Sequence, residues 1–274
     1  MPQAGLTALR SSIRLVHSVF FEPSGPGSYQ ATPATAGPWS ADAQHGGPPS
    51  ALAARAMEQH EADERTRLAR VTVDILRPVP VGTVTLRTRT VRPGRRVALL
   101  ETVMESAGQE VLVARGWRIA RSAEAPLIGD GEPVPDIPGR SWTPSFAGTG
   151  HLAGYLSAVE WRFVDGNLDA MGPCQAWCRP LVPLIEGEEL APMGRALLLA
   201  DSGNGLSMTL DPAKFIFINV DLTVVLQRDP AGDWLLMDSV TTVGDEGTGL
   251  AETQLSDSSG VAGTSLQTLL VAPV

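Results

Sequence analysis

The sequence predicts an α+β fold of two tandem repeats, each with a long central helix wrapped by an antiparallel β-sheet. The main observation is a repeated strand pattern: "TVDILR" begins at Thr72 and "NVDLTV" begins at Asn219, 147 residues later. Aligning the last strand of each half pairs Trp117 with Gln267, an offset of 150 residues. Because a nearly constant offset relates several elements, the sequence indicates an internal repeat.

A segment rich in proline, glycine and serine separates the two halves. Residues 121–146 show neither helical nor strand periodicity, which is typical of a linker or a long connection. The sequence therefore predicts an N-terminal repeat over 1–120, a linker over 121–146 and a C-terminal repeat over 147–274.

The sequence predicts one helix followed by four strands in each half of the chain. Prolines open and alanines fill residues 48–61, which predicts a helix, and residues 192–205 predict its counterpart in the second half. Runs of β-branched residues between turn signals predict the strands. These cover 13–21, 70–79, 83–92, 97–106, 110–119, 158–166, 174–182, 215–228, 233–244, 249–259 and 260–271. One helix followed by a meander of strands indicates a sheet that wraps around the helix.

Composition and charge exclude several classes of protein. The 274 residues carry a net charge of −9, and nucleic acid is not an expected partner because phosphate binding needs a basic surface. No apolar run approaches the roughly 20 residues that cross a bilayer, so no membrane span is expected and the cytoplasm is the expected location. Cys174 and Cys178 are too few for a disulfide framework, and core packing is the favoured interpretation of both.

Two motifs carry a resemblance to a known family. "HGGPPSALAARAM" at 45–57, followed by "VTVDILRPVPVG" at 71–82, resembles the TesB-type acyl-CoA thioesterases, which have a double hotdog fold. The likeness extends from about residue 14 to residue 271 and depends on the order of all the elements. It implies an acyl-CoA thioester as substrate, with no metal and no cofactor other than the coenzyme A of the substrate. Association into a homo-oligomer is left open.

The resemblance also implies three catalytic residues, all in the second half. They are Asp201 on the second helix, Asn219 on the next strand and Gln267 on the last strand. Asp201 and Gln267 match the family by residue type, whereas Asn219 stands where a hydroxyl is usual. An asparagine amide both donates and accepts hydrogen bonds, so it can still orient a water molecule. For each residue the alternative is a solvent-facing position with no catalytic role.

The repeat gives an independent reason to consider these three residues. Their counterparts in the first half are about Ala54, Thr72 and Trp117, so the full polar set occurs only once. Placing polar groups at core-facing positions has a free-energy cost, which indicates that the second copy retained a site.

A substrate-binding turn is predicted at His45, Gly46 and Gly47, directly before the first helix. Free backbone amides at the start of a helix can bind a carbonyl oxygen or an oxyanion, and glycine allows close approach. We therefore expect larger residues at both glycines to lower turnover with little loss of stability. The alternatives are a flexible turn, and His45 acting as a general base.

The first functional hypothesis is acyl-CoA thioester hydrolysis. In it, Asp201 accepts a proton from water or orients that water, Asn219 and Gln267 hold the water in line, and the amides near Gly46 or Gly47 stabilise the oxyanion. Two alternatives remain: a non-catalytic acyl-CoA-binding protein, and a hydratase or dehydratase acting on enoyl or hydroxyacyl thioesters. The hydratase would need a histidine paired with an acid, for which only His45 is suitably placed.

Overall fold

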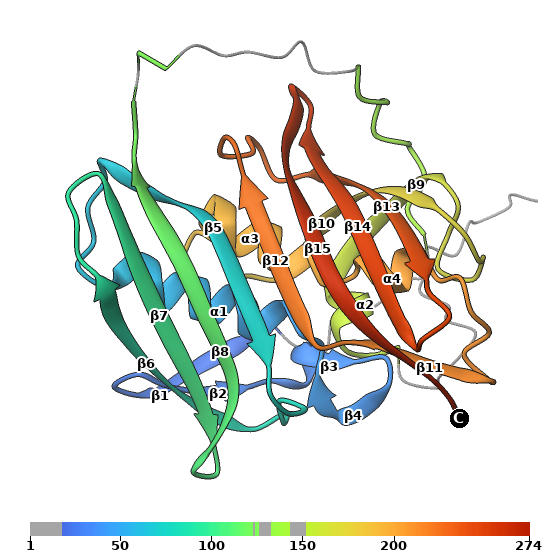
Figure 1. Ribbon diagram of the computed structural model, residues 1–274, viewed down its shortest axis with the longest axis horizontal. Helices are drawn as coiled ribbons and strands as arrows, with labels where there is room; N and C mark the ends of the chain where they lie inside the picture. Colours follow the sequence, from blue (N-terminus) through green and yellow to red (C-terminus); the bar gives the residue numbers. More distant parts are fainter. Residues whose placement is uncertain (1–17, 123, 126–132, 143–151) are drawn as a thin grey trace, which may run out of the picture.

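One large, curved antiparallel sheet forms the protein. The computed structural model describes residues 18–122, 124–125, 133–142 and 152–274 (Figure 1). Thirteen strands make the sheet, in the order β1-β2-β6-β7-β8-β5-β12-β15-β14-β13-β10-β9, with β11 pairing on β15; β3 and β4 form a separate pair. The first-half strands are β1 (Phe21–Gly25), β2 (Ser28–Ala31), β3 (Ala36–Gly37), β4 (Ser40–Gln44), β5 (Thr66–Ile75), β6 (Thr83–Arg92), β7 (Val97–Ser106) and β8 (Gln109–Ala120). The second-half strands are β9 (Val159–Asp165), β10 (Cys174–Pro180), β11 (Phe215–Asn219), β12 (Asp221–Leu226), β13 (Leu235–Val243), β14 (Thr248–Asp257) and β15 (Gly260–Pro273).

The two halves join at the middle of the sheet. Strand β5 pairs with β12 in an antiparallel register that sets Val71 opposite Val224, and Thr72 Oγ1 lies 3.2 Å from Thr223 Oγ1 (Figure 1). Because alternate residues of both strands are apolar, one face of this junction is buried against the helices. The structure is therefore mostly antiparallel sheet, and it is continuous across the halves.

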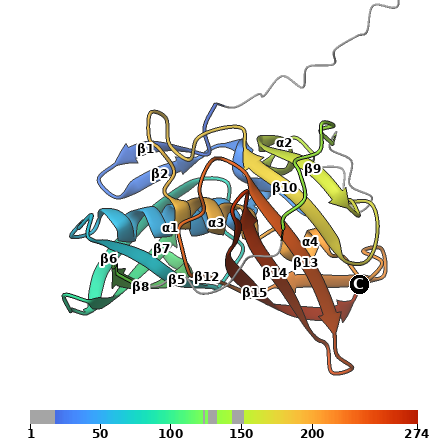
Figure 2. The same ribbon diagram turned by 90° about the horizontal axis from the view of Figure 1, so that it is seen from above.

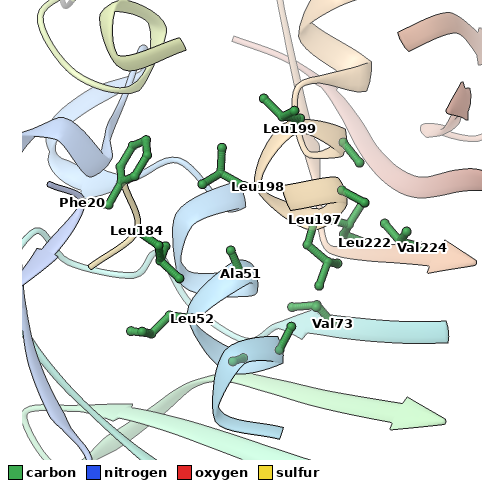
Figure 3. Packing of buried hydrophobic residues seen from close by; sticks show 14 of the residues in the cluster. Phe20, Ala51, Leu52, Val73, Leu184, Leu197, Leu198, Leu199, Leu222 and Val224 are labelled. Atoms are coloured by element: carbon green, nitrogen blue, oxygen red, sulfur yellow. The ribbon is translucent and has the colours of Figure 1, made fainter. Parts of the chain in front are cut away.

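Two helices lie side by side on the concave face of the sheet. They are α1 (Gly47–Gln59) and α3 (Pro192–Ala200), and the sheet curls around them at both edges (Figure 2). The short elements are α2 (Tyr155–Ala158), α4 (Gly203–Leu206) and the 3₁₀ turn η1 (Pro33–Thr35). Leucines 197–199 of α3 and Ala51 and Leu52 of α1 are fully buried. Leu197 points toward Val73, Leu222 and Val224 of the central strands, whereas Leu198 points toward Phe20 (Figure 3).

The second central helix is shorter than the sequence predicts. A single helix over 192–205 was expected, whereas α3 ends at Ala200 and α4 begins at Gly203. Gly203 packs so closely on β14 and β15 that an added Cβ would lie 2.6 Å from Thr253 Oγ1 and 2.9 Å from Gln267 Oε1. The chain bends at this close contact, and the long central helix is seen only in the first half.

Other expectations are met, corrected or left open by the described residues. The strands expected at 83–92 and 97–106 match β6 and β7, whereas the strand expected at 215–228 is divided at Val220 into β11 and β12. Of the strand expected at 13–21, residues 13–17 lie outside the described part, and β1 begins only at Phe21. The boundaries at 120 and 147 and the linker between them stay predictions.

One half-buried carboxyl group of the first helix has a free-energy cost when it is ionised. Burial, and the nearby negative charge of Asp229, raise the pKa of Glu58 to about 7, although Arg118 and Arg55 partly oppose the rise. When the chain unfolds, the carboxyl returns to its ordinary pKa of about 4.5. Because the native state binds a proton more tightly, its stability falls as the pH rises from about 4.5 to about 7.

Replacing Glu58 by glutamine removes this cost. We expect Glu58→Gln to raise the free energy of unfolding at pH 8 by about 1–3 kcal/mol, and to leave it nearly unchanged at pH 4, where Glu58 is protonated. Urea denaturation at the two pH values measures the difference. The exposed Glu64→Gln is the matched control and should have little effect. An equal effect of Glu58→Gln at both pH values would contradict the explanation.

Candidate active site

A cavity of about 560 Å³ lies at the start of α1, between the two halves of the chain. Most of its wall is apolar, and its polar side chains include Gln44, His45, Arg77, Asp201, Asn204 and Asn219. The lining residues are Gly37, Trp39, Ser40, Ala43, Gln44, His45, Gly46, Ile75, Leu76, Arg77, Pro78, Val79, Asp201, Asn204, Ile218, Asn219 and Val220. An apolar cavity with a few convergent polar groups is the usual form of a small-molecule site.

Asp201 lies at the centre of the polar groups. It caps the C-terminus of α3, and its side chain is only 4% exposed. Its Oδ1 accepts hydrogen bonds from Asn219 Nδ2 at 2.8 Å and from Gln267 Nε2 at 3.5 Å, and its Oδ2 lies 2.9 Å from His45 Nδ1. A solvent-facing helix end, the alternative considered from the sequence, is not what the structure shows.

The carboxylate is ionised despite its burial. Burial alone would raise the pKa of Asp201, but the charge and hydrogen bond of His45, with hydrogen bonds from Asn219 and the Gly47 amide, lower the pKa below its ordinary value. Several donors that favour the charged form outweigh desolvation here. The site therefore holds a fixed negative charge at neutral pH.

His45 is held by three contacts. Its amide donates to Thr35 O at 2.7 Å, its ring stacks on Tyr155 with centroids 3.8 Å apart, and Nδ1 faces Asp201. The Gly47 amide also lies 3.2 Å from Nδ1, but an unprotonated Nδ1 would point its lone pair at a carboxylate. The proton is therefore placed on Nδ1, which donates to Asp201, while the Gly47 amide lies near both Nδ1 and the carboxylate.

Asn219 ends β11, at the break before β12. Its Nδ2 donates to Asp201 Oδ1 and, at 3.2 Å, to Asp221 O. The break itself is stabilised by Asp221, whose Oδ1 accepts from the Thr268 amide at 2.6 Å. Asn219 thus donates to Asp201 from the position where the resemblance leads one to expect a hydroxyl.

Gln267 lies behind Asp201 and does not line the cavity. Its side chain is buried, its Oε1 accepts from the Asn204 amide at 3.0 Å, and its Nε2 donates to Asp201 O at 3.1 Å. An exposed edge position, the alternative from the sequence, is wrong. The geometry holds the end of α3 and the start of α4 together, so Gln267 contacts Asp201 and not the cavity.

The two glycines of the turn have different surroundings. Gly46 lines the cavity, and a Cβ there would lie 2.8 Å from both carboxylate oxygens of Asp201. Gly47 faces α3 instead, where a Cβ would lie 2.1 Å from the carbonyl oxygen of Leu198. The expectation that both glycines can be enlarged with little loss of stability is therefore wrong for Gly47.

Sequence reasoning missed two residues of the site. Tyr155 donates its hydroxyl to Leu198 O at 2.8 Å and supports the ring of His45, and burial raises its pKa well above the ordinary value. Asn204 lines the cavity and donates Nδ2 to Phe217 O at 3.4 Å. No motif marks Tyr155, because its contact with His45 joins the two halves; Asn204 stands three residues after Asp201, a spacing that could have drawn attention to it.

The fold and the cavity define a two-repeat hotdog-like protein with one polar site, and sequence comparison gives its family. The family model for the acyl-CoA thioesterase C-terminal domain matches residues 129–271, and that for the acyl-CoA thioesterase N-terminal domain matches residues 35–119. The chain therefore belongs to the acyl-CoA thioesterase family and is a thioester hydrolase of the TesB-like, hotdog type. No curated protein matches it.

Solved structures share the fold over almost the whole chain. A conserved protein of unknown function with a hot dog fold from Alicyclobacillus acidocaldarius is 16% identical, with a TM-score of 0.72 and coverage of 93% of this chain and 96% of that one. The acyl-CoA thioesterase II TesB2 of Mycobacterium marinum is 15% identical, with a TM-score of 0.62 and coverage of 93% and 95%. The tesB protein of Mycobacterium avium subsp. paratuberculosis is 16% identical, with a TM-score of 0.62 and coverage of 93% and 97%.

Within the described residues, no helix has both the length and the apolar character needed to cross a membrane. The cytoplasmic location and the homo-oligomer both stay predictions.

The surroundings of the two glycines predict separate effects. Gly47→Ala should lower the free energy of unfolding by roughly 1–3 kcal/mol, because the backbone of α3 must move away from the new Cβ. Gly46→Ala should instead displace the Asp201 side chain and lower turnover by roughly 10²-fold. Urea denaturation and acyl-CoA hydrolysis measure the two effects.

Gly82→Ala serves as the control for both, since a Cβ there meets no atom within 4 Å. Full turnover in Gly46→Ala would show that the position of Asp201 does not matter for the reaction.

Proposed function

We propose that this chain hydrolyses acyl-CoA at the cavity beside α1, using water activated next to the Asp201 carboxylate. The observation that carries the proposal is a buried, ionised carboxylate at the wall of a mainly apolar cavity, in a chain of the acyl-CoA thioesterase family. A fixed negative charge beside a bound thioester favours removal of a proton from water as the water attacks.

The start of α1 is the place for the thioester carbonyl oxygen. Pro48 and Pro49 have no N–H group, and the Gly47 amide is engaged by the Asp201 carboxylate. The Gly46 amide is therefore the donor of this turn that faces the cavity and is left for a ligand. At the positive end of a helix, this amide can stabilise the oxyanion that forms on the carbonyl.

Asn219 and Gln267 act through Asp201 in this proposal. Both donate to Oδ1, and together they fix the carboxylate in one orientation. Asn219 also lines the cavity, so its amide can contact the attacking water, whereas Gln267 has a positioning role only. Because the reacting groups are already held in a fixed geometry, less entropy is lost when the transition state forms.

The substrate enters along the apolar part of the wall. Ile75, Leu76, Ile218 and Val220 line it, and of these Leu76, Ile218 and Val220 are exposed at the surface. Arg77 is the cationic residue of the lining, apart from His45, and it can pair with a phosphate of coenzyme A. Arg87 and Arg89 lie outside this lining and pair with Glu105 and Glu101.

Loss of the charge of Asp201 tests the proposal. Asp201→Asn keeps the size of the side chain, and we expect kcat for acyl-CoA hydrolysis to fall by roughly 10²–10⁴-fold with little change in KM. Release of coenzyme A, followed with a thiol reagent over acyl groups of different length, gives both constants. The exposed Asp245→Asn is the matched control and should match the wild-type chain.

Two results would contradict the proposal. Calorimetric binding of acyl-CoA without turnover would indicate a non-catalytic binding protein. Hydration of an enoyl thioester without hydrolysis would indicate a hydratase, for which the contact between His45 and Asp201 supplies the required pair.

A further inference from the structure

Every strong contact of the Asp201 carboxylate is already made by the protein. Oδ1 receives the amides of Asn219 and Gln267, while Oδ2 receives His45 Nδ1, and the Gly47 amide also bonds to the group. A carboxylate has about four lone-pair sites. With Asn219 at 2.8 Å, His45 at 2.9 Å and Gln267 at 3.5 Å, few of these sites are left for a water molecule, so the carboxylate is less well placed than a free ring nitrogen to take its proton.

The second ring nitrogen of His45, Nε2, makes no hydrogen bond to the described part of the protein. Nδ1 is the atom engaged with Asp201, and no hydrogen bond among the described residues uses Nε2. Buried side-chain nitrogen or oxygen atoms without a partner occur, within the described residues, only in Gln44, Arg67, Arg70 and Arg195. Nε2 therefore remains accessible, and because His45 lines the cavity with 12% of its side chain exposed, this atom is open to a ligand or water there.

We propose that Nε2 of His45, and not Asp201, takes the proton from the attacking water, with Asp201 orienting the ring and stabilising its charged form. This step rests on the proposed function. The water oxygen forms a bond to the thioester carbonyl carbon, one O–H bond breaks, and its proton moves to Nε2. When the tetrahedral intermediate collapses, the C–S bond breaks and Nε2 returns the proton to the leaving sulfur. The products are the acid and free coenzyme A, and His45 is again neutral.

The surroundings of His45 fit this role. The parallel stack on Tyr155, at an interplanar angle of 6°, fixes the plane of the ring, and Tyr155 is itself held by Leu198 O and by Ser202 Oγ at 3.0 Å. The titratable groups of the described residues that face His45 are Asp201 at the end of α3 and Tyr155 of α2, and Arg77 is the charged residue elsewhere in the cavity lining. A base oriented by a carboxylate is a recurrent catalytic arrangement.

The pH dependence of the wild-type chain separates the two bases. With an imidazole as the base, kcat/KM should begin to fall at a higher pH than with the Asp201 carboxylate as the base. The pKa of Asp201 is lowered below the ordinary value of about 3.8, so with Asp201 as the base the activity would persist to about pH 4. A profile that stays level down to pH 4 would overturn the proposal.

His45→Asn separates a catalytic role from a structural one. The asparagine amide nitrogen occupies the place of Nδ1 and can still donate to Asp201, but no atom replaces Nε2. We expect kcat to fall by roughly 10²–10⁴-fold, with KM little changed and the pH dependence of the remaining activity altered. His60→Asn is the control, because His60 contacts Thr90 and lies outside the cavity.

Each outcome tests either the role of Nε2 or the thioesterase proposal on which it rests. Activity of His45→Asn within about threefold of wild type would overturn the role of Nε2 and leave the thioesterase proposal standing. If His45→Asn does not fold, as judged by circular dichroism, the wild-type pH profile decides alone. Absence of acyl-CoA hydrolysis by the wild-type chain would overturn the proposed function and this step with it.

Discussion

The site depends on how closely the two central helices approach each other. At Gly47, the start of α1 lies against the Leu198 carbonyl near the end of α3, at a distance that leaves no room for a Cβ. An acid at the C-terminus of its own helix is electrostatically unfavourable. Here the N-terminus of α1 and His45 compensate, because they bring positive potential to Asp201. Without this approach the carboxylate would be buried without partners, at a high cost in free energy.

The contact between the two central helices has a looser counterpart at the equivalent position of the other helix, as the repeat predicts. Gly47 and Gly194 stand 147 residues apart, the offset seen in the strand motifs. Gly47 faces the carbonyl oxygen of Leu198, and a Cβ on Gly194 would lie 3.8 Å from the carbonyl oxygen of Ala51. These two contacts are equivalent under the repeat, since Ala51 and Leu198 are also 147 apart. The helices therefore contact each other at equivalent positions of the two repeats, closely at Gly47 and more loosely at Gly194.

Local patterns predicted the fold well and the site only in part. The strands 83–92 and 97–106 were predictable because turn residues bound them on both sides. The break of α3 after Ala200 was not, since it depends on the contact of Gly203 with β14 and β15. Asp201, Asn219 and Gln267 were named from a resemblance, and in the structure Asn219 and Gln267 each donate to Asp201. The contact of His45 with Asp201 joins residues 156 positions apart, which no periodicity encodes.

The repeat also explains why one half of the chain has no polar site. The position equivalent to Asp201 is Ala54, which is fully buried in the middle of α1, and the position equivalent to His45 is Pro192. An alanine and a proline there provide no charge and no titrating ring. The first repeat thus contributes the turn and the histidine, the second contributes the carboxylate, and neither is complete alone. We therefore expect one ligand to bind per chain, and neither half to bind it when the two are separated.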